Sequence, residues 1–317
     1  MEPAVPNPTE ANPPLPLPPL GVGTWAWGDR IVWGYEGDYG RADVEAAFHA
    51  SLAAGLSFFD TAEVYGWGTS ERILGALGRS SPAPLVLATK YAPFRPGAAA
   101  LGRALHGSLR RLAVEQIDLY QIHFPPPLVR IERLMDALAE AVDDGRLLAV
   151  GVSNFSAAQM RRANAALARR GVALTSNQVE YSLLHRAPER DGVLRACREL
   201  GVTLIAYSPL AMGLLGGGYD PLAGRLPRRL RRYLAGARAE AIAALLRLLR
   251  EIGAAHGRTP AQVALNWLLR QPGLTAIPGA KTARQAEDNA GALGWSLTDA
   301  EAAALDRAST PAPDPLP

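Results

Sequence analysis

The sequence predicts an α/β protein with the (β/α)8 TIM barrel fold in a single domain, and three observations support this. Short apolar segments alternate with helical segments eight times, at spacings of roughly 25–45 residues for most of the chain. Such alternation implies parallel strands joined by right-handed crossovers. No G-x-G-x-x-G sequence follows an early strand, although an open dinucleotide-binding sheet usually carries one. The chain of 317 residues is long enough for one barrel.

The predicted strands are short and nearly all apolar, as expected for strands that helices cover. They are residues 21–25, 56–60, 85–90, 117–123, 147–153, 174–179, 203–207 and 274–277. Between them, apolar residues recur with helical spacing. The first helix is followed by Gly55 as a C′ glycine, and Ser70 is predicted to cap the second. The predicted helices are residues 42–52, one from 70, 98–112, 131–142, 157–168, one ending at 200, 237–255, 260–269, 283–293 and 298–308.

The barrel is expected to occupy residues 20–309, with extra helices near 237–255 and 298–308. Residues 1–19 are rich in proline and lack the apolar stretch of a secretory signal, so they are predicted to be a disordered lead-in. Residues 310–317 form a similar tail.

Composition narrows the class of protein. Hydrophobic residues make up 48% of the chain and charged residues 20%, which provides for a sizeable core. The single cysteine, Cys197, excludes an internal disulfide framework and fits a reducing compartment. No apolar run approaches ~18 residues, so no membrane span is expected. We therefore expect a cytoplasmic protein, a monomer or weak homo-oligomer, that binds a small molecule rather than nucleic acid or membrane; no metal site is assigned.

Polar residues stand where the apolar strands stop. In a barrel of this kind the carboxyl ends of the strands share one rim, and the chemistry takes place there. Six of the eight predicted strands end in such residues: Asp60, Lys90, His123, Ser153 with Asn154, Gln178, and Tyr207 with Ser208. Each residue alone would fit an ordinary structural role, but their convergence predicts a functional site.

These neighbours suit a proton donor built on Tyr65, five residues after Asp60. A free phenol holds its proton too tightly to be an ideal acid at neutral pH, and a nearby lysine ammonium such as Lys90 favours the phenolate. Asp60 would keep a buried Lys90 charged, and His123 would donate a hydrogen bond to a carbonyl oxygen. Carbonyl reduction also needs a hydride, for which a nicotinamide cofactor is the expected source.

The sequence resembles the aldo-keto reductase family over residues 21–309. The matching segments occur in order and with suitable spacing: residues 59–66 (FDTAEVYG), 88–90 (ATK), 119–123 (LYQIH), 151–155 (GVSNF), 176–179 (SNQV), 206–210 (AYSPL) and 277–281 (IPGAK). The resemblance implies reduction of aldehydes or ketones with NADPH. It implies Tyr65 as the proton donor, tuned by Lys90 and Asp60, and His123 as the group that orients the carbonyl.

The resemblance also implies which residues bind the cofactor and the substrate. Lys281, with Arg284 beside it, favours NADPH over NADH because it offers a charge to the 2′-phosphate. The implied cofactor-binding residues are Gly23, Thr24, Trp25, Asp60, Ser153, Asn154, Gln178, Tyr207, Ser208, Leu210, Gly213, Gly216, Gly279, Ala280, Lys281, Gln285, Asp288 and Asn289. Trp25, Tyr65 and His123 are expected to line the substrate pocket, and Trp33 and Tyr35 to make it tolerant of aromatic compounds.

Two departures from the family produce further expectations. The segment before residue 20 is too short and proline-rich for the hairpin that plugs the barrel floor in relatives, so a partly open floor is predicted. Residues 225–238 contain six arginines with one aromatic residue, which favours a solvated flap near the cofactor over a nucleic-acid site.

Two other functions remain open at this point. One is an aldolase in which Lys90 forms a Schiff base with the substrate. The other is a cofactor-loaded regulatory barrel with little turnover, comparable to the subunits of ion channels within the same family.

Overall fold

The computed structural model describes residues 15–94, 99–222, 227–233 and 238–309. Its eight strands form one sheet in the order β1 to β8, with every neighbouring pair parallel. They are β1 (Val22–Gly23), β2 (Phe58–Asp60), β3 (Val86–Tyr91), β4 (Ile117–Ile122), β5 (Leu147–Ser153), β6 (Leu174–Glu180), β7 (Thr203–Tyr207) and β8 (Leu274–Ile277). Pairings of Leu20 with Ala276 and of Gly23 with Gly279 join the first strand segment to the last. The predicted (β/α)8 barrel is therefore confirmed.

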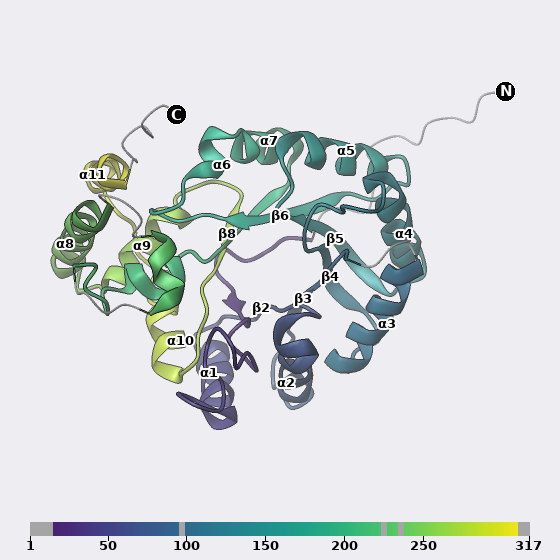
Figure 1. The fold of residues 1–317 in the computed structure, drawn as a ribbon, viewed down its shortest axis with the longest axis horizontal. Coiled ribbons are helices and arrows are strands. Elements are labelled where there is room, and N and C mark those ends of the chain that lie inside the picture. The colour runs from purple at the N-terminus through teal and green to yellow at the C-terminus, as the bar shows by residue number, and fades with distance from the viewer. Residues whose placement is uncertain (1–14, 95–98, 223–226, 234–237, 310–317) are drawn as a thin grey trace.

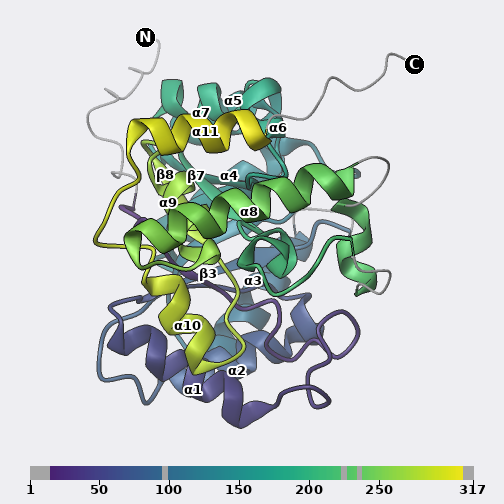
Figure 2. The same ribbon diagram turned by 90° about the vertical axis from the view of Figure 1, so that its left-hand side faces the viewer.

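Helices surround the strands on the outside of the barrel (Figure 1). They are α1 (Arg41–Ala53), α2 (Thr69–Gly78), α3 (Ala99–Leu112), α4 (Ile131–Asp143), α5 (Ala157–Ala168), α6 (Ala187–Arg190), α7 (Val193–Leu200), α8 (Arg238–His256), α9 (Pro260–Leu269), α10 (Ala283–Ala290) and α11 (Asp299–Ser309). Short 3-10 helices η2 (Tyr65–Gly68), η3 (Ala211–Gly216) and η4 (Arg228–Tyr233) follow β2 and β7. The extra helices predicted near residues 237–255 and 298–308 are α8 and α11, which pack on the outside (Figure 2).

The apolar residues form two clusters. The larger one fills the space between the strands and the helices. The smaller one lies inside the barrel and comprises Phe58, Ala88, Leu119, Ala149, Ile205 and Ile277. Because each strand buries both faces, the strands read as continuous apolar runs in the sequence.

The end of the predicted lead-in belongs to the barrel. Leu15 and Leu17 pack against the inner cluster, and Pro19 accepts a hydrogen bond from the Ala276 amide at 2.9 Å. These contacts place an extended segment under the barrel floor, where an open floor was expected. Proline suits this position because the backbone is extended and few of its amides are needed as donors. Residues 1–14 and the tail 310–317 lie outside the described residues.

One predicted cap is wrong. Gly68, with a left-handed backbone, precedes α2, and Ser70 lies inside the helix. The Ser70 hydroxyl is fully buried and bonds to the hydroxyls of Thr24 and Thr61, both at 2.8 Å. It therefore ties α2 to β1 and β2 rather than capping the helix. The predicted C′ residue Gly55 does have the expected left-handed backbone, at φ +81°.

Candidate active site

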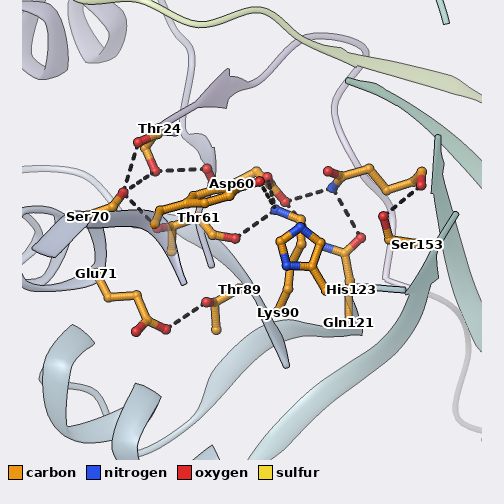
Figure 3. Close-up of polar contacts among 12 residues, drawn as sticks. Thr24, Asp60, Thr61, Ser70, Glu71, Thr89, Lys90, Gln121, His123 and Ser153 are labelled. Atoms are coloured by element: carbon orange, nitrogen blue, oxygen red, sulfur yellow. Dashed lines mark hydrogen bonds and ion pairs between the residues drawn. The ribbon is translucent and has the colours of Figure 1, made fainter. Parts of the chain in front are cut away.

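Four ionisable side chains meet at the carboxyl ends of neighbouring strands. Asp60 is the last residue of β2, Lys90 lies near the end of β3, and His123 directly follows β4. Tyr65 begins η2, in the loop between β2 and α2. Figure 3 shows Asp60, Lys90 and His123 directed toward one another. The fold thus brings together the four residues predicted as the catalytic set.

Lys90 is fully buried and is surrounded by oxygen atoms. Its Nζ forms an ion pair with Asp60, donates to the Thr61 carbonyl at 2.8 Å and lies 3.3 Å from the Tyr65 hydroxyl. Burial lowers the pKa of Lys90, and attraction to Asp60 and Tyr65 raises it. The attraction has the larger effect, so the pKa lies above its ordinary value. Lys90 is therefore a cation at neutral pH.

Tyr65 keeps its proton in this environment. Burial raises the pKa of Tyr65 and the Asp60 charge adds to this, whereas Lys90 lowers it; the result is above the ordinary value. Lys90 lowers the pKa of Tyr65, as expected, but the desolvation of the phenolate outweighs the ammonium charge. Lys90 still lies beside the oxygen on which charge develops when the proton leaves.

His123 is a neutral imidazole next to Tyr65. Its ring meets the Tyr65 ring edge-on, with centroids 5.7 Å apart, and stacks on Phe124 at 4.4 Å. Burial and the Lys90 charge lower the pKa of His123 to about 3. A neutral imidazole has one N–H, so His123 can donate a hydrogen bond to a substrate oxygen without bringing a second charge.

A cavity of about 790 Å³ opens over these residues. Tyr65, His123 and Trp25 line it, as predicted for the substrate pocket. Most of the residues predicted for the cofactor line it too: Gly23, Thr24, Trp25, Asp60, Ser153, Asn154, Gln178, Tyr207, Ser208, Leu210, Gly213, Gly216, Gly279, Lys281, Gln285, Asp288 and Asn289.

Three expected residues are not part of this wall. Ala280 is fully buried, and its carbonyl accepts a hydrogen bond from the Trp27 indole at 2.7 Å, so it supports the pocket from behind. Tyr35 packs against Tyr39 with ring centroids 5.7 Å apart and lies outside the cavity, whereas Trp33 lines it. Arg284 is exposed and does not line the cavity.

Amide and hydroxyl groups cluster beside the catalytic set. Asn154 has a left-handed backbone at φ +60°, which asparagine tolerates, and its Nδ2 donates to the His123 carbonyl at 3.0 Å. Its Oδ1 accepts from the Tyr207 hydroxyl at 3.1 Å, and its Nδ2 also reaches Ser153 Oγ at 3.1 Å. Gln178 lies next to them and donates to Asp60 at 2.8 Å. Donors and acceptors of this kind match a carboxamide.

Positive groups gather around Trp33 in the cavity wall. Lys281 Nζ lies over the rings of Trp33 and Tyr39, and the Arg229 guanidinium lies 5.2 Å from the Trp33 centroid. Burial and Arg229 lower the pKa of Lys281. Trp33 Nε1 and Arg229 Nε are buried with no hydrogen-bond partner among the described residues. Unpartnered donors beside two cations fit the phosphate groups of a dinucleotide.

The arginine-rich segment lies beside the cavity and is solvated only in part: its described arginines are exposed except for Arg229, which is half-buried. Arg229 donates to the Tyr219 hydroxyl at 2.6 Å, and Arg232 donates to Glu180 at 2.5 Å. Leu230 and Tyr233 are buried between these contacts. Residue 225 lies outside the described part of the chain. No sequence pattern distinguished Arg229 and Arg232 from the other arginines of the segment. Which arginines make contacts depends on which face of η4 meets the barrel.

Sequence reasoning missed several other residues of the wall. Val64 and Phe124 stand next in the chain to Tyr65 and His123, and their adjacency was the available signal. Gln121, two residues before His123, was quoted only as part of a motif, although it donates to Asp60 at 3.1 Å.

A parallel barrel with a protonated tyrosine, a buried lysine–aspartate pair and a dinucleotide-sized cavity defines the class of barrel oxidoreductases. Comparison with known proteins specifies the family: the Aldo/keto reductase family model matches residues 19–310, and the chain belongs to that family.

Relatives span nearly the whole chain. Pyridoxal reductase, chloroplastic, from Arabidopsis thaliana is 38% identical over 316 residues, covering 95% of this chain and 85% of the relative. An aldo/keto reductase from Klebsiella pneumoniae, solved with NADP and acetate, superposes with a TM-score of 0.74 at 31% identity, covering 94% and 93% of the two chains. The glycerol dehydrogenase from Gluconobacter oxydans has a TM-score of 0.82 at 28% identity, covering 97% and 99%.

The family and the barrel predicted from the sequence are thus confirmed. In the described part of the chain no helix is both long and apolar enough to cross a membrane. The cytoplasmic location, the oligomeric state and the absence of a nucleic-acid partner stay predictions.

Proposed function

We propose that the protein reduces aldehydes or ketones to alcohols with NADPH, with Tyr65 as the general acid. The observation that carries the proposal is the Lys90 ammonium, held by Asp60 and 3.3 Å from the Tyr65 hydroxyl at the wall of the cavity. A proton donor of this kind needs a cation next to the oxygen that becomes negative.

The residues of the chain divide the chemistry between them. His123 donates a hydrogen bond that orients the carbonyl oxygen toward Tyr65. Tyr65 transfers its proton to that oxygen, and Lys90 stabilises the phenolate that remains. NADPH, when bound, supplies the hydride that adds to the carbonyl carbon. Lys90 and His123 are buried and Tyr65 is half-buried, which strengthens these interactions because less water competes for them.

The cavity suggests how the chain holds the cofactor. We assign the carboxamide of the nicotinamide to Ser153, Asn154 and Gln178, and the face of its ring to Tyr207. We assign the phosphate groups of the cofactor to Lys281 and to the unpartnered N–H donors of Trp33 and Arg229. Lys281 favours a 2′-phosphate, because burial and Arg229 leave its charge in need of an anion.

The substrate we propose is an aromatic aldehyde of about the size of pyridoxal. Trp25 stacks near Tyr65 with ring centroids 6.1 Å apart, and Trp33 meets Trp25 edge-on at 5.7 Å. Phe124 and Val64 complete an apolar wall beside the acid. The similarity to pyridoxal reductase from Arabidopsis thaliana supports the same class.

An aldolase mechanism is disfavoured by the state of Lys90. A Schiff base requires a neutral, accessible amine, whereas Lys90 is fully buried and its pKa is raised. The regulatory alternative would combine tight NADPH binding with very slow turnover of every carbonyl offered.

The test measures NADPH oxidation with pyridoxal and a panel of aromatic and aliphatic aldehydes. Tyr65→Phe should lower kcat by about 10²- to 10⁴-fold, the usual contribution of a general acid, while NADPH binding persists. Tyr181→Phe, a buried tyrosine outside the cavity, is the control and should keep its turnover. Full activity in Tyr65→Phe would overturn the mechanism, and equal rates with NADH would overturn the role of Lys281.

A further inference from the structure

Gln121 lies inside the barrel and does not line the cavity, yet it is hydrogen-bonded to two residues that do. It is fully buried in β4, opposite Lys90 on one side and Gly151 on the other. A Cβ added at Gly151 would lie 2.9 Å from Gln121 Cγ and 2.3 Å from Ser176 Oγ. Gly151 therefore leaves the space through which the Gln121 side chain reaches past β5.

The Gln121 side chain closes a triangle of hydrogen bonds. Its Nε2 donates to Asp60 Oδ2 at 3.1 Å, and its Oε1 accepts from Gln178 Nε2 at 3.3 Å. Gln178 Nε2 also donates to Asp60 Oδ2, at 2.8 Å. The other Asp60 oxygen is taken by Lys90. Figure 3 marks hydrogen bonds of this network as dashed lines beside the labelled Asp60 and Gln121.

The triangle has a fixed direction. An ionised carboxylate only accepts hydrogen bonds, so both amides must present nitrogen to Asp60. The Gln121 oxygen then faces the second hydrogen of the Gln178 amide. Both hydrogens of that amide are thereby engaged, and its oxygen is the only polar atom of the Gln178 side chain left for the cavity.

We propose that Gln121 is a positioning residue for the nicotinamide end of the cofactor, an inference that rests on the proposed function. Gln121 accepts the second hydrogen bond of the Gln178 amide and so prevents that amide from rotating about its one hydrogen bond to Asp60. The Gln178 oxygen therefore stays directed at the N–H groups of the carboxamide. The same contact joins the nicotinamide subsite to the Lys90–Asp60 pair, so hydride donor and proton donor share one support.

The experiment compares two ligands in wild type, Gln121→Leu and Gln121→Glu. NADPH engages the nicotinamide subsite, whereas 2′,5′-ADP carries only the phosphates and adenosine. In Gln121→Leu, which keeps the side-chain volume, the NADPH Kd should rise by about five- to tenfold, the factor for one neutral hydrogen bond. The Kd of 2′,5′-ADP should stay within about twofold of that of wild type, since no contact with the phosphates is removed.

Gln121→Glu adds a pH-dependent readout. A protonated carboxyl can donate to Asp60 and accept from Gln178, and so reproduces the triangle. Two neighbouring carboxylates raise the pKa of one of them, and the network fails once both are ionised. The NADPH Kd of Gln121→Glu divided by its 2′,5′-ADP Kd should therefore match the wild-type ratio at low pH and exceed it increasingly as the pH rises. The 5′-phosphate monoester of 2′,5′-ADP titrates near neutral pH, whereas the diphosphate of NADPH does not. Each variant's ratio is therefore divided by the wild-type ratio at the same pH, which removes the titration of both ligands.

Each outcome decides the matter. Equal weakening of both ligands in Gln121→Leu, together with a ratio in Gln121→Glu that stays parallel to that of wild type at every pH, would reduce Gln121 to a structural residue. Unchanged NADPH affinity in both variants would remove it from cofactor binding altogether. If wild type itself fails to bind NADPH, the proposed function fails instead.

Discussion

Burial decides the charge of His123, and this has a consequence for stability. In the folded protein its pKa is about 3, against about 6.5 for a free histidine. Between these values the unfolded chain binds the additional proton, so stability falls as the pH is lowered from about 6.5 toward 3. Above pH 6.5 this contribution is constant.

Urea unfolding at pH 7 and pH 5 measures the effect. From pH 7 to pH 5 the wild type should lose about 2 kcal/mol more than His123→Gln, which has no group that titrates in this range. The kcat/KM of the wild type should likewise show no break near pH 6.5 that belongs to His123. The same pH dependence in both proteins would mean that His123 is charged when folded.

For single residues, the sequence predicted which side chains come together better than it predicted their burial and pKa. The grouping of Asp60, Tyr65, Lys90 and His123 follows from polar residues at or near strand ends, because a parallel barrel brings those ends together. The direction of the Tyr65 pKa did not follow, since it depends on how far burial outweighs the Lys90 charge. The roles of Gln121 and Gly151 required the register between β4, β5 and β6, which no sequence pattern specifies.

The elements that carry the site are held together by a buried ion pair. Glu71 in α2 is fully buried; it accepts from Thr89 in β3 at 2.7 Å and pairs with Arg111 of α3 at 2.5 Å. Thr89 precedes Lys90 in the chain, so this contact connects the helix after the Tyr65 loop to the strand that carries the ammonium. Arg111 also packs against Gly68, where a Cβ would lie 2.7 Å from its Cδ.

Arg111→Ala leaves the Glu71 carboxylate buried without its cation. We expect a loss of about 3–5 kcal/mol in the free energy of unfolding, measured by urea denaturation. Arg162→Ala is the matched control, because its pair with Glu132 at 2.9 Å is more exposed and should be worth at most about 1 kcal/mol. Similar losses in the two variants would show that the Glu71 pair has no special weight.

The elements themselves were predictable, but their junctions were less so. Apolar runs and helical spacing predicted the eight strands and most of the helices, since both patterns come from burial, but not the break between α6 and α7 or the 3-10 helices. Ser70 was assigned to a cap because serine favours caps, whereas its hydroxyl instead joins Thr24 and Thr61 within the fold. The segment with Arg229 was assigned to solvent on its arginines and its single aromatic residue, although guanidinium groups also stack on aromatic rings elsewhere in the chain, such as Trp33.

The residues that line the cavity and the residues that close the barrel floor lie at opposite ends of the barrel axis. The catalytic set and the cavity lie at the carboxyl ends of the strands, and the segment with Leu15 and Leu17 enters from the opposite end. Conserving the fold at one end leaves the loops at the other free to define the substrate. The sequence suggested an open floor because it lacked a hairpin, but two leucines on an extended segment also cover the inner cluster.

Leu17→Ala tests this separation. Removing a half-buried leucine side chain from the inner cluster should cost about 1–2 kcal/mol of unfolding free energy, chiefly through the apolar area returned to water. The kcat for carbonyl reduction and the NADPH Kd should stay unchanged at temperatures well below the transition, since Leu17 does not line the cavity. Leu222→Ala, an exposed leucine, is the control and should shift stability by less than about 0.5 kcal/mol. A Leu17→Ala variant with full stability would mean that the segment merely rests on the floor. One with lost turnover but normal stability would show instead that the floor and the active site are coupled through the barrel interior.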